Sequence, residues 1–157
     1  MKKLILGAIV MIGTMYARDV ALVNNKLYAN ECGSCHMAYQ PGLMIENSWK
    51  KIMGNLSNHF QVDASLNKKD RMTLTAYLVK NSSDKSSAYL SRVITKYTNP
   101  NRAPLRITQG QVFGSYHAEV GNRYFKRKSV GSASNCAACH TTANRGLYNE
   151  DYVRIPR

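Results

Sequence analysis

The sequence predicts an all-α protein, and three observations lead to this prediction. Apolar residues recur at intervals of three and four in several segments, as on one face of a helix. No segment alternates apolar and polar residues as a half-buried strand does. Hydrophobic residues make up 44% of the chain and charged residues 20%, so a folded core is expected, and 157 residues suffice for one ordinary domain or two small ones.

The first element, residues 1–17, is basic and then apolar. Two lysines precede an almost wholly apolar run from Leu4 to Met15, and polar chain follows. This pattern is typical of a secretory signal peptide, and the run is shorter than the roughly 20 residues that a membrane-spanning helix needs. We expect cleavage after Ala17 and a periplasmic mature protein. Because Met15 departs from the small-residue rule for cleavage sites, an uncleaved segment that anchors the protein to the membrane stays open.

Three helices are expected in the first half of the mature chain. Asp19 can cap a helix that continues to Cys32, and Pro41-Gly42 then breaks the chain. A second helix carries Trp49, because apolar residues recur around it at helical spacing. A third helix spans roughly residues 67–80, with the asparagine at its start as a cap. These helices would surround one common site.

The second half is expected to be less regular. A helix over residues 87–97 must end before the prolines that follow, and a short helix over residues 109–120 carries a histidine. Residues 121–134 have no clear periodicity and should be mostly irregular. Asn135 can cap one more short helix, and Gly146 can end it.

A motif of two cysteines and a histidine occurs twice. Its residues are Cys32, Cys35 and His36 near the N-terminus, and Cys136, Cys139 and His140 near the C-terminus. In c-type haem attachment, two thiols separated by two residues add to the two vinyl groups of one porphyrin, and the histidine that follows lies beneath the iron. The sequence therefore predicts two covalently attached c-type haems, with His36 and His140 as proximal axial ligands.

The same cysteines have other conceivable uses. Four cysteines in an exported chain could form two disulfides, and Cys-x-x-Cys pairs also serve as redox dithiols or as halves of a four-cysteine zinc site. None of these uses requires a histidine directly after the second cysteine. Because a histidine follows both pairs, haem attachment is the favoured interpretation.

The chain contains only two further histidines, His59 and His117, which is one for each haem. His59 ends the segment with Trp49 and lies at helical spacing from Ile52 and Leu56, on an apolar face where an unpaired imidazole would be costly. His117 lies three to four residues from apolar neighbours. We therefore predict His59 as the distal ligand of the first haem and His117 as the distal ligand of the second.

Two alternatives to this ligand set stay open. Methionine is the other common sixth ligand, and the mature chain offers Met37, Met44, Met53 and Met72. His117 could instead be a partly exposed residue beside Glu119, which would leave the second haem with an open position. An open position is what a small dihaem redox enzyme, such as a peroxidase or an oxide reductase, would need.

The chain is strongly basic, with 22 lysine and arginine residues against 9 aspartate and glutamate residues. Removal of residues 1–17 takes away two lysines, which leaves 20 against 9 and a formal net charge of +11. Export and the lack of a binding motif argue against nucleic acid as a partner. The charge favours an acidic protein partner or an anionic membrane surface, and no small-molecule substrate is expected.

Several stretches together resemble the soluble dihaem cytochrome c family and cover most of the mature chain. They are the run from Cys32 to Leu43, Ser48-Trp49, His59-Phe60 with Asp63 to Leu66, the run from Asn135 to His140, and the tail from Asp151 to Arg157. Gln61 stands where the family often has glycine, and residues 45–47 depart from the usual run before Ser-Trp. Neither departure touches a predicted ligand.

The resemblance implies a class I-like N-terminal haem domain at residues 18–84, followed by a linker and an irregular C-terminal haem domain at residues 85–157. It also implies bis-histidine ligation of both irons, with His59 and His117 at the distal positions, and a role as an electron carrier. The redox partners it suggests are a membrane b-type cytochrome and a small oxygen-binding monohaem cytochrome c. A dihaem redox enzyme, a haem-based sensor and a fixed subunit of a membrane complex are the rival functions.

Overall fold

A computed structural model describes residues 18–157, so the predicted signal peptide at residues 1–17 lies outside the described residues. The described part of the chain consists of α-helices, single 3-10 turns and loops, with no strand, which confirms the all-α prediction. Its only β pairing is two isolated bridges, His59 with Val62 and His140 with Val153. No helix in residues 18–157 is long and apolar enough to cross a membrane.

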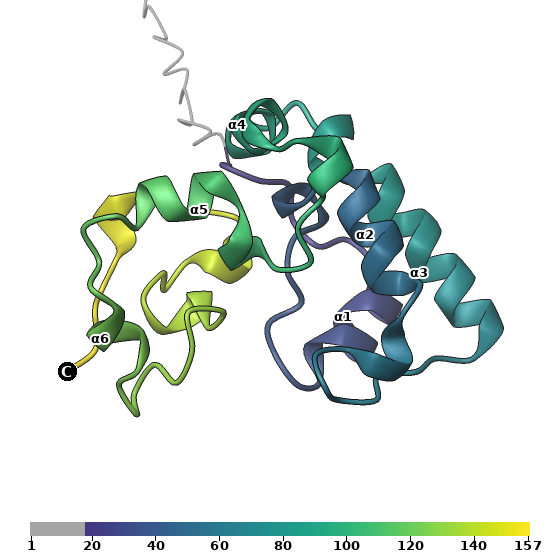
Figure 1. Ribbon diagram of the computed structural model, residues 1–157, viewed down its shortest axis with the longest axis horizontal. Coiled ribbons are helices and arrows are strands. Elements are labelled where there is room, and N and C mark those ends of the chain that lie inside the picture. Colours follow the sequence, from purple (N-terminus) through teal and green to yellow (C-terminus); the bar gives the residue numbers. More distant parts are fainter. Residues whose placement is uncertain (1–17) are drawn as a thin grey trace, which may run out of the picture.

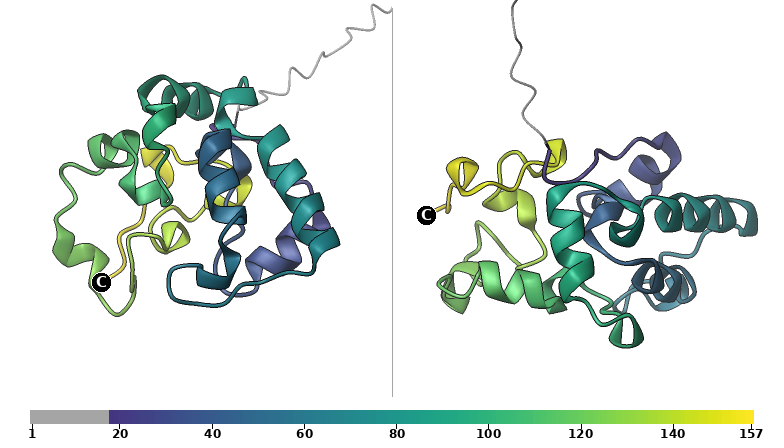
Figure 2. Two further views of the ribbon diagram at one scale, coloured as in Figure 1. Left: turned by 45° about the vertical axis from the view of Figure 1, so that its right-hand side comes forward. Right: turned by 90° about the horizontal axis from the view of Figure 1, so that it is seen from above.

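The helices form two lobes that lie side by side, as Figures 1 and 2 show. The six α-helices of the described residues are α1 (Lys26–Gly33), α2 (Glu46–Met53), α3 (Lys68–Lys80), α4 (Tyr89–Tyr97), α5 (Gln111–Tyr116) and α6 (Asn122–Phe125). The first three make one lobe, and α5, α6 and the C-terminal segment make the other. α4 lies between them and contacts both the turn after the first motif and α5.

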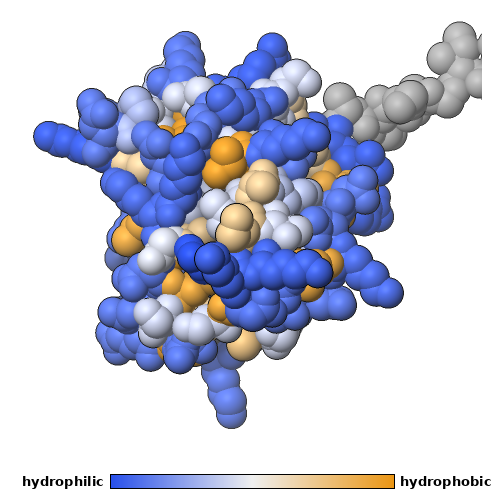
Figure 3. Space-filling view, turned by 90° about the vertical axis from the view of Figure 1, so that its right-hand side faces the viewer, coloured by the Kyte–Doolittle hydropathy of each residue, from blue (hydrophilic) through white to orange (hydrophobic). Residues whose placement is uncertain are grey.

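The first lobe has its apolar core between α1, α2 and α3. The buried members of this core are Tyr28, Met44, Trp49, Met53, Leu74 and Leu78. The Trp49 indole N–H donates to the Pro41 carbonyl at 2.8 Å, which satisfies its one polar atom inside the core. Two of the four methionines considered as iron ligands, Met44 and Met53, are thus core residues, and Met72 is exposed on α3. Hydrophilic side chains cover most of the outer face of this lobe (Figure 3).

A second core joins the lobes and draws residues from both halves of the chain. Its buried members are Val20, Leu43, Leu90, Ile94 and Val112. The first described residues cross to the C-terminal lobe, where the Val20 amide donates to the Gly146 carbonyl at 3.2 Å. Gly146 has φ +69°, and a Cβ there would lie 2.4 Å from the Val20 carbonyl oxygen, so only glycine fits.

The predicted start of the first helix is wrong. α1 begins at Lys26, because the side chain of Asn25 accepts a hydrogen bond from the Tyr28 amide and caps the helix there. The Asp19 carboxylate has a long-range partner instead and accepts from the Tyr148 amide at 2.6 Å. This bond ties the start of the described chain to the second lobe.

The helix that carries Trp49 is shorter than predicted. α2 ends at Met53 with Gly54 as its cap, and a 3-10 turn (Leu56–Asn58) follows before His59. His59 therefore does not lie on the apolar face of that helix. Glycine and asparagine at positions 54 and 55 end the helix despite the apolar periodicity that continues beyond them.

The other predicted helices match the structure better. α3 begins after Asn67, whose side chain accepts from the Asp70 amide at 3.0 Å, as predicted for a cap. α4 ends before Pro100, and Gly146 ends its turn in the left-handed conformation. Asn135 does not cap, because its side chain donates to the Val130 carbonyl, and the residues after it form only a 3-10 turn. The domain boundary after residue 84 stays a prediction.

Candidate haem sites

The two motifs lie on different local structures. In the first, Cys32 is in the last turn of α1, and Cys35 and His36 follow the end of the helix. In the second, a 3-10 turn (Cys136–Ala138) carries the first cysteine, and Cys139 is its cap. None of the four cysteines forms a disulfide, and all of them lie in the described residues. Both motifs thus present their sulfur atoms on a single turn followed directly by histidine.

The first motif faces His59. The imidazole centroids of His36 and His59 are 6.1 Å apart, with ring planes at 29°. The Nδ1 of His36 lies 2.8 Å from the Met37 carbonyl oxygen, which can only accept, so Nδ1 carries the proton. This leaves Nε2 of His36 as the free nitrogen. An outer hydrogen bond of this kind fixes the tautomer and the orientation of a metal-ligating histidine.

A tight turn presents His59. The His59 amide donates to the Val62 carbonyl at 2.8 Å, and the Val62 amide donates back at 3.2 Å. The two residues between them, Phe60 and Gln61, have φ of +57° and +76°. Both angles lie in the left-handed region that favours glycine. The position where the family often has glycine is therefore one that the turn itself makes unfavourable for Gln61.

The second motif faces His117. The centroids of His117 and His140 are 5.9 Å apart, with ring planes at 71°. His117 caps the C-terminus of α5, and its Nδ1 donates to the Phe113 carbonyl at 2.9 Å. The Phe113 ring stacks on the imidazole at 4.1 Å between centroids. In contrast to His36, His140 has a buried Nδ1 atom with no hydrogen-bond partner within residues 18–157.

An imidazole pair on one iron has a characteristic separation. Two metal–nitrogen bonds of about 2 Å each, with about 1 Å from each nitrogen to its ring centre, put the ring centroids about 6 Å apart. The observed separations of 6.1 Å and 5.9 Å match this value. Both histidine pairs therefore fit an iron between them, with the cysteines of the adjacent motif available for the porphyrin.

The second pair also faces a cavity large enough for a cofactor. This cavity has a volume of about 950 Å³, and the predicted residues Cys136, Cys139, His140 and His117 all line it. Apolar side chains such as Phe113 and Phe125 line it as well. Cofactor pockets in proteins are typically about 300–1,000 Å³ and mostly apolar with a few polar groups. The cavity fits a porphyrin held by the second motif.

Burial determines the charge state of the site residues. Desolvation, with a smaller contribution from His36, lowers the pKa of His59, and desolvation is also the main cause that lowers the pKa of His140. A lowered pKa keeps imidazole neutral, which is the form that binds a metal. Burial likewise raises the pKa of the Cys32 thiol to about 11, so its sulfur is uncharged at neutral pH.

Tyr39 connects the two sites, and the sequence analysis assigned it no role. Its ring stacks on His36 with 4.9 Å between centroids. Its hydroxyl donates to the Ser134 carbonyl at 2.6 Å, and that same carbonyl accepts from the Cys136 amide at 3.0 Å. A continuous chain of contacts therefore runs from the proximal histidine of the first motif to a cysteine of the second. The only signal in the sequence was the position of Tyr39, three residues after His36.

A second bridge runs beside the first. The buried Gln40 side chain donates to the Ala143 carbonyl at 2.6 Å and accepts from the Tyr148 hydroxyl at 2.7 Å. The Tyr148 ring in turn lies 5.5 Å from the His140 imidazole, between centroids. Tyr39 and Gln40 thus hold the second site against the first.

Two Cys-x-x-Cys-His motifs on a helical fold, each with a second histidine at the separation of an axial pair, define a c-type cytochrome with two haems. Comparison with known proteins identifies the family. The chain matches the family "Dihaem cytochrome c" over residues 28–148 and belongs to it. It is therefore a haem-containing cytochrome with two c-type haems. None of the curated proteins compared with the chain matches it.

Solved structures agree with this assignment. The structure described as "Diheme cytochrome c from Rhodobacter sphaeroides" is 40% identical, with a TM-score of 0.69, and the match covers 81% of this chain and 98% of that one. A dihaem cytochrome c from Shewanella baltica is 34% identical, also with a TM-score of 0.69, over 84% of this chain and 93% of that one. The family match at residues 28–148 contains both motifs.

Proposed function

We propose that the protein is an exported electron carrier in which both irons have two histidine ligands. His36 and His59 would hold the first iron, and His140 and His117 the second. The observation that carries this proposal is the pairing of each motif with one further histidine at 6.1 Å and 5.9 Å between ring centroids. A histidine–methionine first haem has less support. Met44 and Met53 are buried in the core, Met72 is exposed, and Met37 directly follows the proximal His36 in the chain, whereas His59 lies at the separation of a ligand pair.

Each haem, when bound, supplies a one-electron ferric/ferrous couple. The residues of the chain would bind the haems and limit which reactions the irons can undergo. The cysteines would attach the porphyrin, and the Nδ1 hydrogen bonds of His36 and His117 leave their Nε2 atoms free to bind the iron. With two histidine ligands, each iron would keep no position for oxygen, peroxide or a substrate. This arrangement favours electron transfer over catalysis at iron.

The Tyr39 bridge supports a relay between the two haems. A stacked ring, one hydrogen bond of 2.6 Å and one of 3.0 Å connect His36 to Cys136 without a gap. Electrons that enter at either haem could then be shared by both. The protein would carry two electrons per molecule.

Export and partners complete the proposal. The basic and apolar segment at residues 1–17 favours a periplasmic protein. The family resemblance favours redox proteins as partners, with a membrane b-type cytochrome and a small oxygen-binding monohaem cytochrome c as the two candidates. The mass of the purified protein tests export, because cleavage gives a chain that begins at Arg18 and carries two haems.

Carbon monoxide binding tests the ligand assignment and separates a carrier from an enzyme. Wild-type protein should hardly bind carbon monoxide in the reduced state, since both irons are six-coordinate. His117→Ala should bind one equivalent at the second haem and show a high-spin signal. His59→Ala is the matched control and should open the first haem instead. A wild-type protein that binds one full equivalent would contradict the carrier proposal and favour a dihaem enzyme.

A further inference from the structure

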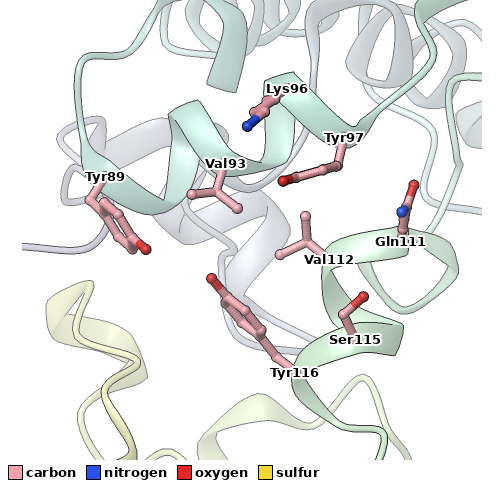
Figure 4. A pocket seen from close by; sticks show the side chains of 8 residues that line it. All are labelled: Tyr89, Val93, Lys96, Tyr97, Gln111, Val112, Ser115 and Tyr116. Carbon is pink, nitrogen blue, oxygen red and sulfur yellow. The ribbon is translucent and has the colours of Figure 1, made fainter.

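A cleft of about 540 Å³ lies between α4 and α5, outside both haem sites. Three tyrosines line this tyrosine cleft: Tyr89, Tyr97 and Tyr116, which are 59%, 47% and 60% exposed. Figure 4 shows the Tyr89 and Tyr116 hydroxyls directed toward one another from the two helices. Lys96 lines the same cleft, with its ammonium group 5.1 Å from the centre of the Tyr97 ring.

Exposed tyrosines that gather in one cleft are unusual on a surface without a partner. Single apolar residues are scattered over most protein surfaces, whereas clusters of aromatic side chains mark binding sites. Tyrosine contributes a rigid ring together with a hydroxyl that can donate a hydrogen bond. The tyrosine cleft thus has the composition of a protein-binding site.

The cleft shares a wall with the second haem site. Tyr89, Val112 and Tyr116 line both the tyrosine cleft and the 950 Å³ cavity that contains Cys136 and His140. The two spaces therefore adjoin, and a molecule seated in the cleft would lie next to the second haem site.

The two helices that form the cleft carry positive charge only. α4 and α5 together contain two basic residues, Arg92 and Lys96, and no acidic residue. Arg92 and Lys96 are exposed on α4 itself. Such a surface attracts and orients molecules of negative charge.

We propose that the tyrosine cleft is the docking site of an acidic one-electron redox protein, with a carboxylate of that partner among the tyrosine hydroxyls and the Lys96 ammonium. This inference rests on the proposed carrier function and names its docking surface. A concave cleft accommodates a protruding carboxylate side chain, whereas a membrane surface contacts only groups that protrude from the protein. One electron passes between the partner and the second haem, so one is oxidised as the other is reduced, and no bond forms or breaks.

Reduction of the holoprotein by a known acidic donor tests this proposal. The probe is the anionic flavodoxin hydroquinone, which gives one electron to a ferric haem and becomes the neutral semiquinone without transfer of a proton. The variants are Lys96→Glu and Tyr97→Ala, because both residues line the cleft but not the haem cavity. The matched control is Lys69→Glu, an equal change of charge on the exposed side of α3. The second-order rate constant is measured at rising ionic strength.

The wild-type rate should fall as salt increases, and Lys96→Glu should lower the rate about tenfold at low salt and weaken its salt dependence. Tyr97→Ala should also slow reduction, and Lys69→Glu should change the rate by less than about twofold. Equal slowing by both charge reversals would overturn the proposal, since net charge alone would then explain the rate. Cleft variants that keep the flavodoxin rate but lose binding to vesicles of anionic lipid would also overturn it and assign the surface to a membrane.

Chemical reduction by dithionite and reoxidation by ferricyanide check the carrier function independently. If wild-type protein cycles both haems in this way while the cleft variants keep the wild-type flavodoxin rate, the docking inference fails and the carrier function stands. If neither haem cycles reversibly, the proposed function itself fails.

Discussion

The two histidine pairs differ at the scale of single residues. The ring planes of His36 and His59 meet at 29°, whereas those of His117 and His140 meet at 71°. The Nδ1 of His36 has a carbonyl partner, and the buried Nδ1 of His140 has none within residues 18–157. Since an outer hydrogen bond makes an imidazole a more basic ligand, the two irons of the proposed sites would have unlike environments. The two haems should therefore differ in reduction potential.

Replacement of His59 tests the first site. His59→Met should keep the haem attached through Cys32 and Cys35 while it raises the potential of that haem, because histidine–methionine ligation generally does so. A spectroscopic redox titration measures both potentials. Met53→Leu is the control, since Met53 is buried in the core and should leave the titration unchanged. A titration that His59→Met leaves unaltered would remove His59 from the ligand set.

Gln61 carries a conformational cost that glycine would not. Its φ of +76° costs an L-residue about 1–2 kcal/mol, which glycine would not lose. Glycine also has more conformational freedom in the unfolded chain, and this freedom offsets about 0.5–1 kcal/mol of the stabilisation. Gln61→Gly should therefore raise the free energy of unfolding by about 0.5 kcal/mol in urea denaturation. Gln61→Ala retains the cost and should show no gain. Equal stability of both variants would contradict strain at this turn.

The attachment residues are the part of the site that the sequence predicts most directly, because covalent chemistry dictates the spacing of Cys32, Cys35 and His36. Their role stays a prediction. The structure brings His59 near His36, yet the reason given from sequence was wrong, because α2 ends at Met53 and a turn presents the histidine instead. Tyr39 was missed, since its role depends on a contact with Ser134, 95 residues away.

At the scale of elements, the segment after the first motif holds the lobes together. Tyr39→Phe keeps the ring on His36 and removes the hydroxyl that donates to the Ser134 carbonyl. The lost hydrogen bond should cost about 1 kcal/mol, or about 3 °C in melting temperature. Electron redistribution between the haems after flash reduction should also slow. Tyr152→Phe, at an exposed ring, is the control. A variant with both properties unchanged would contradict the bridge.

Packing of α1 gives the protein a pH-dependent stability. Tyr28 is buried, and its hydroxyl donates to the Tyr39 carbonyl at 2.8 Å. Burial raises the pKa of Tyr28 well above its ordinary value of 10.0. The folded protein therefore keeps this proton at a pH where the unfolded chain has lost it. The stability that the protonated Tyr28 contributes is fully present below pH 10 and is lost as the pH rises further.

Tyr28→Phe should remove this dependence. At pH 7 the variant should be about 1 kcal/mol less stable than wild type, because the Tyr39 carbonyl loses its donor. Above pH 10 the Tyr28 hydroxyl lowers the free energy of unfolding of wild type by about 1.4 kcal/mol per pH unit. The difference in stability between wild type and Tyr28→Phe should therefore vanish near pH 11. Urea denaturation at both pH values measures it. A difference that stays constant from pH 7 to pH 11 would contradict the assignment.

The elements also show what a sequence can predict. α3 matches its prediction because Asn67 caps its start, and α4 matches because it has a clear apolar face and a proline after its end. α1 and the turn after Asn135 did not, because Asp19 and Asn135 have partners far along the chain or in a loop that local patterns do not reveal. Cap residues predict a helix start only when no tertiary partner competes for the side chain.

At the scale of the whole molecule, the two lobes pack on one another through a common core. The first described residues pack on the C-terminal lobe, and the core around Leu90 draws on both halves. The sequence predicted the number of haem sites and the helical class, because both are set by local patterns. The way the lobes join was not predictable, since it depends on contacts such as that of Val20 with Gly146.

The electron paramagnetic resonance spectrum of the fully oxidised protein tests the central claim most directly. Two bis-histidine haems give only low-spin signals, and the ring angles of 29° and 71° predict one ordinary rhombic signal and one strongly anisotropic signal of equal intensity. A high-spin signal with the intensity of one haem would mean that one iron lacks its second histidine, and it would contradict the account of this protein as an electron carrier.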